Sequence, residues 1–274
     1  MRKMDASVVI PVKNGSKFLR ECLISCFCQV TEYSFEIILV DDHSTDETMS
    51  IASEYWNSKE GIFKALKNRG VGISDALNTG ISASNAPFII RLDADDVMKP
   101  HRIQKQISYI YQHPEVVLLG GQIDLISEAP INGEPNAYPC SDSSLRSFLS
   151  KGCFFAHPTV LFRKDAVEKI GGYNSKFDGA EDYELWLLLS QFGMMENLNE
   201  ALIDYRIHPD QFTVSKRRKS LIATARVRLS FILNVGRFGK TSGPRRHEIS
   251  KISMVISLLL EFVHYLYREV RSKL

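Results

Sequence analysis

The chain has 274 residues, of which 44% are hydrophobic, 24% charged and 10% aromatic. This composition is typical of a soluble globular protein with one large domain, or with a domain and an appendage. The five cysteines are not spaced as a metal cluster would require, and the first residues show no apolar signal segment. We therefore expect reduced thiols in a cytosolic protein.

The charge of the chain is unevenly distributed. The formal net charge is only +2, but residues 1–215 carry 20 basic and 29 acidic side chains, whereas residues 216–274 carry 14 and 3. An acidic body with a basic tail indicates metal and phosphate chemistry in the first part and an anionic partner for the second. We predict a catalytic domain over 1–215 and a basic helical extension over 216–274.

Apolar strands alternate with helices in the first hundred residues. The predicted strands are 6–12, 35–40, 62–66 and 87–92, and the helices after the first three of them end near residues 27, 56 and 82. This alternation predicts an α/β fold with a mostly parallel central sheet and helices on both faces. Ligands of such sheets bind at the carboxyl ends of the strands.

The pattern is looser after residue 97. We expect a helix over 98–113, two strands over 116–126 broken at Gly120-Gly121, a strand over 159–162, a helix over 183–192 and a strand over 201–207. Glu181 and Asp182 stand at the head of the second of these helices.

Three carboxylates, those of Asp93, Asp95 and Asp96, follow the fourth strand. Alternate side chains of a strand point to the same face, so Asp93 and Asp95 are expected to lie together. Carboxylates this close repel each other unless a cation lies between them. Their oxygens suit Mg²⁺ or Mn²⁺, which would in turn hold phosphate oxygens. If this motif is considered alone, the alternative to a metal site is a solvated acidic turn.

Six segments, in order, resemble the family 2 glycosyltransferases, which are GT-A fold enzymes that use nucleotide-sugar donors. The segments are Val8–Val12 with Asn14, Val40–Asp42, Leu92–Asp96, His157–Thr159, Glu181-Asp182 with Trp186, and Tyr205-Arg206 with His208. The match spans residues 6 to about 213. It departs at Lys13, where the family more often has an aromatic residue, and this affects the expected packing around the nucleotide base.

The resemblance implies a nucleotide-sugar donor, with UDP as the family's preference. Pro11 and Asn14 would lie beneath the nucleotide. Asp41 or Asp42 would accept a hydrogen bond from the uracil or the ribose; the family pattern favours Asp42, and helix N-capping is the alternative role of this pair. Arg69 would offset diphosphate charge, with a solvated arginine as the alternative. Asp93 would reach the ribose or the waters of the metal.

The resemblance also implies the residues of the reaction. Asp95 and His208 would bind Mn²⁺ or Mg²⁺, which neutralises the leaving diphosphate. Asp182 would be the general base for the acceptor hydroxyl, and repulsion from Glu181 would raise its proton affinity. A single base opposite the leaving group implies inversion at the anomeric carbon. Alternatively, Glu181 and Asp182 are acidic residues of the first helical turn that the helix dipole favours, with no role in the reaction.

Two aromatic residues complete the expected site, with His157 in its wall and Trp186 in the core behind the base rather than on a sugar ring. The resemblance implies a hexosyl- or N-acetylhexosaminyl-transferase that extends a glycan or lipid-linked glycan in cell-surface polysaccharide or lipopolysaccharide synthesis. The alternatives are a catalytically inactive nucleotide-sugar-binding or scaffold protein and a sugar-phosphate nucleotidyltransferase. The loop after the first strand is not glycine-rich, as the latter would need.

The tail begins with four basic residues, 216–219, and predicts one helix to about 235 and another from about 248 to 271. The apolar run 252–266 is shorter than the roughly 20 residues that span a bilayer. Basic flanks around an apolar helix predict a segment on an anionic membrane surface, here the inner face of the plasma membrane. A helix pair packed on the catalytic domain and a homodimer contact are the alternatives. No nucleic-acid-binding module accompanies the charge.

Overall fold

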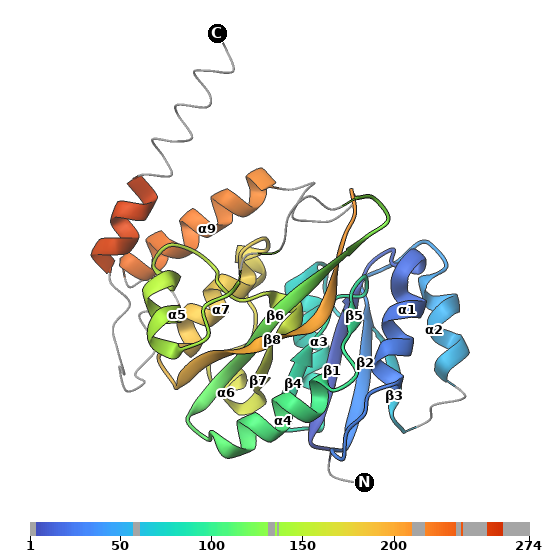
Figure 1. Ribbon diagram of the computed structural model, residues 1–274. Helices are drawn as coiled ribbons and strands as arrows, with labels where there is room; N and C mark the ends of the chain where they lie inside the picture. Colours follow the sequence, from blue (N-terminus) through green and yellow to red (C-terminus); the bar gives the residue numbers. More distant parts are fainter. Residues whose placement is uncertain are drawn as a thin grey trace.

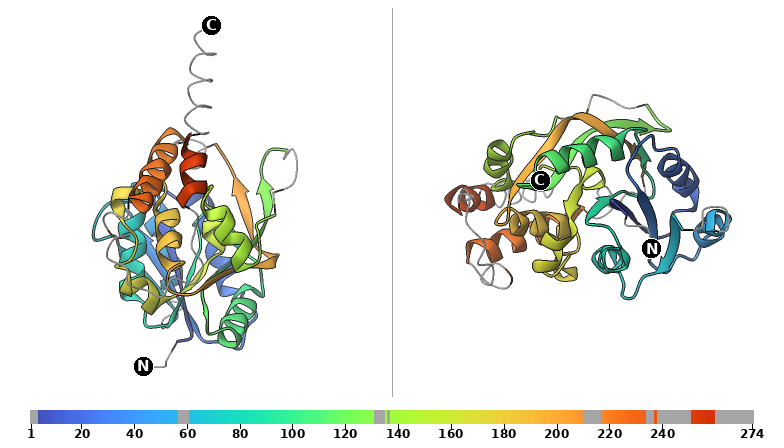
Figure 2. Two further views of the ribbon diagram at one scale, coloured as in Figure 1. Left: turned by 90° about the vertical axis from the view of Figure 1, so that its left-hand side faces the viewer. Right: turned by 90° about the horizontal axis from the view of Figure 1, so that it is seen from below.

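The computed structural model describes residues 4–56, 61–130, 135, 137–209, 217–233, 237 and 251–259. Its centre is an eight-stranded sheet with the strand order β3-β2-β1-β4-β7-β6-β8-β5, and helices cover both of its faces (Figures 1 and 2). The fold is therefore α/β with a mostly parallel first half, as the sequence predicts.

The strands are β1 (Ala6–Val12), β2 (Phe35–Asp41), β3 (Phe63–Lys67), β4 (Phe88–Arg91), β5 (Val97–Met98), β6 (Val116–Ser127), β7 (Leu161–Arg163) and β8 (Met194–Ile207). The helices are α1 (Ser16–Phe27), α2 (Thr48–Trp56), α3 (Ile73–Ala83), α4 (Arg102–Gln112), α5 (Asp142–Leu149), α6 (Lys164–Lys169), α7 (Glu181–Leu189) and α9 (Arg217–Ile232). Two 3₁₀ turns, η1 (His157–Thr159) and η2 (Ser175–Phe177), lie among them.

The central strand β1 explains why the sheet needs helices on both faces. It pairs in parallel with β2 on one side and β4 on the other. Because its side chains alternate, Val8 and Ile10 join the core under α1, α2 and α4, whereas Val9 joins the core under α3, α6 and α7. The carboxyl ends of β1, β2 and β4 consequently meet at one edge, where the loops of the candidate site begin.

Several predicted boundaries in the second half are wrong. The strand pair expected to break at Gly120-Gly121 is one continuous strand, β6, which pairs in parallel with β8. The chain does not turn at Gly120. A glycine fits this position because a Cβ atom would collide with the side chains of Asn197 and Phe155. β8 begins at Met194 rather than at residue 201.

Two other segments differ because of pairing that is distant in sequence. Val97 and Met98 form β5 against β8, so the helix expected from residue 98 begins only at Arg102. The strand expected over 159–162 is η1 followed by β7 at 161–163, which runs antiparallel to β4 and β6. The α7 helix begins at Glu181 and ends at Leu189, three residues before the predicted end.

The described part of the tail packs on the core that contains α7. Ala223 and Val227 of α9 and Met254 of the helical stretch 251–259 are buried in the same core as α7. Figures 1 and 2 show both helices at the end of the molecule opposite the N-terminus, near the carboxyl ends of the strands. None of the described helices is both long and apolar enough to cross a membrane. The predicted helix beyond residue 259 lies outside the described residues.

Candidate active site

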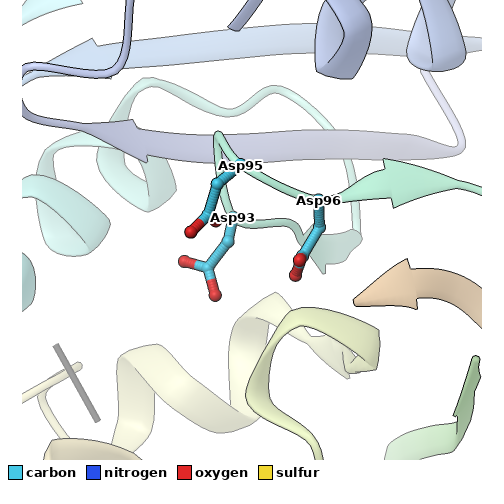
Figure 3. A group of neighbouring side chains, drawn as sticks. All are labelled: Asp93, Asp95 and Asp96. Atoms are coloured by element: carbon cyan, nitrogen blue, oxygen red, sulfur yellow. The ribbon is translucent and has the colours of Figure 1, made fainter. Parts of the chain in front are cut away.

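The carboxylates of Asp93, Asp95 and Asp96 lie on the turn between β4 and β5, with one ligand atom of each within 4.8 Å of the others. Figure 3 shows all three side chains on the same side of this turn. The sequence prediction that Asp93 and Asp95 lie together is confirmed, and Asp96 joins them.

Asp93 and Asp95 each have one close basic partner. Arg91, which is 2% exposed, donates to Asp93 at 2.5 Å, and the Nε2 atom of His208 lies 2.9 Å from Asp95 Oδ2. Burial raises the pKa of Asp93, and the guanidinium of Arg91 opposes that shift. The carboxylate oxygens of this group suit Mn²⁺ or Mg²⁺, and the imidazole beside Asp95 adds a nitrogen ligand of the kind that transition metals, rather than Mg²⁺, bind.

Asp96 is the buried member of the group. Its Oδ1 atom accepts the backbone N–H of Arg206 at 2.8 Å, while its Oδ2 atom has no hydrogen-bond partner among the described residues. Burial, followed by the charges of Asp93 and Asp95, holds the pKa of Asp96 well above its ordinary value. A cation beside this group would remove that penalty, so an unpartnered buried oxygen fits the metal expected here.

His208 is held in place by the end of β8. Its ring lies 5.1 Å from the ring of Phe18, and the guanidinium of Arg206 lies over the same Phe18 ring at 4.5 Å. Arg206 also donates to the backbone carbonyl of Asp95 at 2.8 Å and to Glu21 at 2.5 Å. His208 is therefore held by its contacts with Phe18 and Asp95, and Arg206 links the same two residues.

Asp42 lies at the carboxyl end of β2 and is held by three donors. It accepts from the side chain of Asn68 at 2.7 Å, from the backbone N–H of Gly72 at 3.1 Å and from Lys13 at 3.3 Å. Burial tends to raise its pKa, but these hydrogen bonds outweigh burial and lower it, so the side chain is a carboxylate. Arg69 is exposed in the same loop between β3 and α3.

The loop after β1 is tied to the loop after β2. Asn14, in the left-handed region with φ of 51°, accepts from the backbone N–H of Thr45 at 2.8 Å and donates its own backbone N–H to Ser44 at 2.9 Å. Asp41 accepts from the backbone N–H of Ser44 at 3.1 Å. Of the two neighbouring acids, Asp41 thus organises the loop, and Asp42 faces the other way. Pro11 lies in β1 just before this loop.

The first turn of α7 carries Glu181 and Asp182. Asp182 Oδ1 accepts from the backbone N–H of Tyr183 at 2.7 Å, and Oδ2 accepts from the thiol of Cys153 at 3.4 Å. Burial raises the pKa of Asp182, so the predicted direction is right, but burial rather than Glu181 is the largest cause. Burial and then the charge of Asp182 raise the pKa of Glu181 to about 7. Sequence reasoning missed Cys153, because nothing in its local pattern connects it with Asp182.

His157 and Trp186 lie behind this turn. His157 Nε2 is 2.9 Å from the hydroxyl of Tyr173, and burial together with the charge of Arg91 holds its pKa well below the ordinary value. The imidazole is therefore neutral. Trp186 is fully buried, edge-on to His157 with ring centroids 5.7 Å apart and beside Phe155. It lies in the core, as expected, and not on a surface open to a sugar.

The two acidic groups belong to one site. The charge of Asp182 raises the pKa of Asp93, and the charge of Arg91 lowers the pKa of Asp182. Because such effects fall off with distance, the head of α7 faces the turn after β4. A candidate base and a candidate cation site thus both lie within electrostatic reach of buried Arg91, at the carboxyl edge of a doubly covered sheet.

A fold of this kind with paired acids at its carboxyl edge is that of the nucleotide-sugar-dependent glycosyltransferases. The sequence model of the family "Glycosyl transferase family 2" matches residues 7–171. The chain belongs to this family and is a glycosyltransferase.

Three known proteins illustrate the similarity. The chain is 33% identical over 217 residues to the amylovoran biosynthesis glycosyltransferase AmsE of Erwinia amylovora, which covers 77% of this chain and 79% of AmsE. The crystal structure of S. aureus TarS 1–349 in complex with UDP-GlcNAc superposes with a TM-score of 0.67 at 19% identity, over 86% of this chain and 69% of TarS. The mannosyltransferase PcManGT of Pyrobaculum calidifontis, in complex with GDP-Man and Mn²⁺, gives 0.66 at 17% identity, over 86% and 66%. These structures confirm the predicted GT-A fold.

Proposed function

We propose that this glycosyltransferase moves a sugar from a UDP-sugar onto a glycan or lipid-linked glycan during cell-surface polysaccharide or lipopolysaccharide synthesis. The observation that carries the proposal is that Asp182, with its raised pKa, lies within electrostatic reach of the Asp93–Asp96 turn. The polysaccharide setting is supported by the similarity to AmsE, whose name describes amylovoran biosynthesis.

The residues that would hold a divalent cation are Asp95 and His208, with Asp93 and Asp96 close by. When bound, Mn²⁺ or Mg²⁺ would neutralise the diphosphate that leaves. Arg91 keeps Asp93 oriented by its ion pair, so that Asp93 can accept a hydrogen bond from the ribose or from a water. The Mn²⁺ complex of PcManGT supports a metal in this fold.

Asp182 would take the proton of the acceptor hydroxyl as the sugar is transferred. A raised pKa suits a general base, because proton affinity and ionised fraction are then balanced nearer to neutral pH. With Asp182 as the single base, the hydroxyl would displace the leaving group directly and the anomeric carbon would invert. Glu181 would contact the sugar or the acceptor beside the base.

The nucleoside end of the donor would lie between the loops after β1 and β2. Asp42 is already ionised and oriented by its three donors, so it can accept from the uracil N–H or a ribose hydroxyl without rearrangement. Pro11 and Asn14 would line the floor, and Arg69 would approach the diphosphate. The UDP-GlcNAc complex of TarS supports a UDP-sugar, while GDP-Man in PcManGT makes GDP the rival nucleotide.

The donor site is tested by isothermal titration of the purified protein with UDP, GDP and CMP, each with and without Mn²⁺. We expect UDP to bind in the presence of Mn²⁺, and this binding to vanish in Asp95→Ala. Asp165→Ala, which removes an exposed carboxylate paired with Lys169, is the matched control and should bind as the wild type does. Failure of all three nucleotides to bind would refute the donor site, and binding that needs no metal would remove the metal from Asp95.

We further propose that the tail holds the enzyme on an anionic membrane at the inner face of the plasma membrane. The described tail helices expose large apolar side chains on the side away from the core: Leu221, Ile222, Leu229, Leu233, Ile252, Val255, Ile256 and Leu259. The 14 basic residues of 216–274 against 3 acidic ones complement anionic lipid headgroups.

Membrane binding is tested by sedimentation with vesicles of phosphatidylcholine, with and without phosphatidylglycerol. We expect binding only to the anionic vesicles and its loss in Leu229→Glu with Ile252→Glu. Ile24→Glu, at an apolar residue of α1 that is also about half exposed, is the control. If the tail surface is a homodimer contact instead, the double variant will change the sedimentation coefficient of the free protein and leave vesicle binding unaltered.

A further inference from the structure

Among the residues that the structure describes, Cys153 is the one side chain that donates a hydrogen bond to Asp182 from outside α7. It lies in the segment between α5 and η1, and its Sγ atom is 3.4 Å from Asp182 Oδ2. The thiol has a second possible acceptor, the backbone carbonyl of Phe155 at 3.7 Å. The carboxylate is nearer and charged, so it takes the thiol proton.

The thiol stays protonated wherever Asp182 can act as a base. Burial and the charge of Asp182 hold the pKa of Cys153 well above its ordinary value. Cys153 is therefore a constant S–H donor and not a nucleophile. Because Oδ1 already accepts the backbone N–H of Tyr183, the thiol fixes the remaining oxygen, and the carboxylate plane has one orientation.

A thiol is a weaker hydrogen-bond donor than a hydroxyl or an amide, so it lowers the basicity of the Asp182 carboxylate less than either would. Hydrogen bonds to a carboxylate stabilise its charged form and lower its pKa, whereas burial raises it. At Asp182 burial is the larger effect and the Cys153 bond opposes it. A weak donor thus orients the carboxylate while leaving most of its raised proton affinity.

We propose that Cys153 is a positioning residue that orients Asp182 and sets its basicity for the transfer reaction. The proposal rests on the proposed role of Asp182 as the general base. The other charged or titratable groups that act on Asp182, or feel its charge, are Arg91 and Asp93 near the end of β4, Glu181 of α7, and the phenols of Tyr138 and Tyr173. All of them are retained in the variants below.

The direct test is the pKa of Asp182, measured from the carboxyl carbon signals of ¹³C-aspartate-labelled protein and assigned with Asp182→Asn. Cys153→Ala should raise this pKa by about half a unit to one unit, because a hydrogen bond to a charged group is worth on the order of one unit and the thiol is a weak donor. Cys153→Ser, which restores a donor, should return the pKa to the wild-type value or below. Cys140→Ala, at a thiol bonded elsewhere, is the control.

The kinetic test is the pH profile of UDP release from UDP-N-acetylglucosamine or UDP-galactose with water as the acceptor. The acidic limb should move up with the pKa of Asp182 in Cys153→Ala and return in Cys153→Ser. Cys153→Val fills the space without a donor and should behave like Cys153→Ala if the alanine variant is poorly folded. An unchanged pKa in the alanine and valine variants, or equal shifts in all three, would overturn the proposal.

The two proposals can fail separately. If Asp182→Asn releases UDP as fast as the wild type, Asp182 is not the base and the proposed mechanism fails. The carboxyl titration would still show whether Cys153 orients and tunes Asp182, because that measurement does not depend on turnover.

Discussion

The Nε2 atom of His208 lies 2.9 Å from Oδ2 of Asp95, although 113 positions of the chain separate the two residues. Strand pairing sets this distance. β5 begins two residues after Asp95 and pairs with β8 through Val97 and Asp204, four residues before His208. The two-residue strand β5 thus joins the turn that holds the acids to the end of the last strand.

This contact predicts that His208 contributes to metal-dependent binding of the nucleotide. His208→Ala should weaken the binding of UDP in Mn²⁺ by roughly 10- to 100-fold, because a charged or metal-directed contact is worth about 1.5–3 kcal/mol. Isothermal titration with and without Mn²⁺ measures the change. His101→Ala, at an exposed histidine before α4, should have no effect. Equal affinities in the His208 variant and the wild type would contradict the assignment.

Asp182→Asn should lower the rate of UDP release by about 10²- to 10⁴-fold, the usual contribution of general base catalysis, and leave UDP affinity unchanged. The amide keeps the shape of the side chain and can still accept at one atom, so the fold should be retained. Comparing kcat from UDP release with Kd from titration separates the two effects. Asp165→Asn serves as a control, and a parallel loss of UDP binding would show that Asp182 holds the donor instead.

The raised pKa of Glu181 predicts that the stability of the protein depends on pH. Burial first, and then the charge of Asp182, raise its pKa from 4.5 to about 7 in the folded protein. Between these two pH values the folded state binds a proton that the unfolded state has lost, so this group makes the free energy of unfolding fall as the pH rises from 4.5 to 7.

The variant Glu181→Gln should not show this fall. Above pH 7 it should be more stable than the wild type, relative to their difference at pH 4.5, by on the order of 3 kcal/mol. Urea unfolding of both proteins from pH 4.5 to 8 provides the measurement. Glu168→Gln, at an exposed acid of α6, should follow the wild-type curve. Parallel curves for Glu181→Gln and the wild type would mean that Glu181 is ionised in the folded state.

The contacts of Arg228 lead to the prediction that the tail stabilises α7. It is 1% exposed, donates to the backbone carbonyl of Lys151, and lies 3.4 Å from the hydroxyl of Tyr183, next to Asp182. Arg228→Met should lower the free energy of unfolding by about 2–4 kcal/mol, because the carbonyl is left without its donor and the packing changes. Arg226→Met, on the exposed side of the same helix, should change it by less than about 0.5 kcal/mol. Thermal melts of both variants measure these losses of stability. Equal losses in the two variants would contradict the proposed role of Arg228.

The parts of the fold that could be predicted from the sequence are those with a local signal. The buried strands β1, β2 and β4 are continuous apolar runs, and the helices between them have a regular apolar period, so both were found. The acids at 93–96 and 181–182 stood out because charges follow or precede apolar segments directly. The continuity of β6 through Gly120 has no such signal, because Gly120 marks a close approach of Asn197 and not a turn, and the start of β8 has none either.

The rest of the site depends on contacts that are distant in sequence. Cys153 looks like an isolated cysteine until the fold brings it to Asp182. Asp96 looks like part of a turn, but its burial and its bond to Arg206 follow from β8. Arg228 appears as one more charge in a basic tail, and only packing on α7 shows that it is buried.

The pairing of β5 with β8 also has a consequence for synthesis on the ribosome. Asp93, Asp95 and Asp96 emerge within the first hundred residues, whereas His208 leaves the exit tunnel only after nearly all of the catalytic domain has been made. Until then β5 has no partner strand, and Asp96 lacks the backbone N–H of Arg206. In the nascent first half, Asp93 therefore has its ion-pair partner Arg91, but Asp95 and Asp96 lack His208 and the backbone N–H of Arg206. The group of Asp93, Asp95 and Asp96 is completed by β8, so it forms only after that strand has been made and not with the first strands.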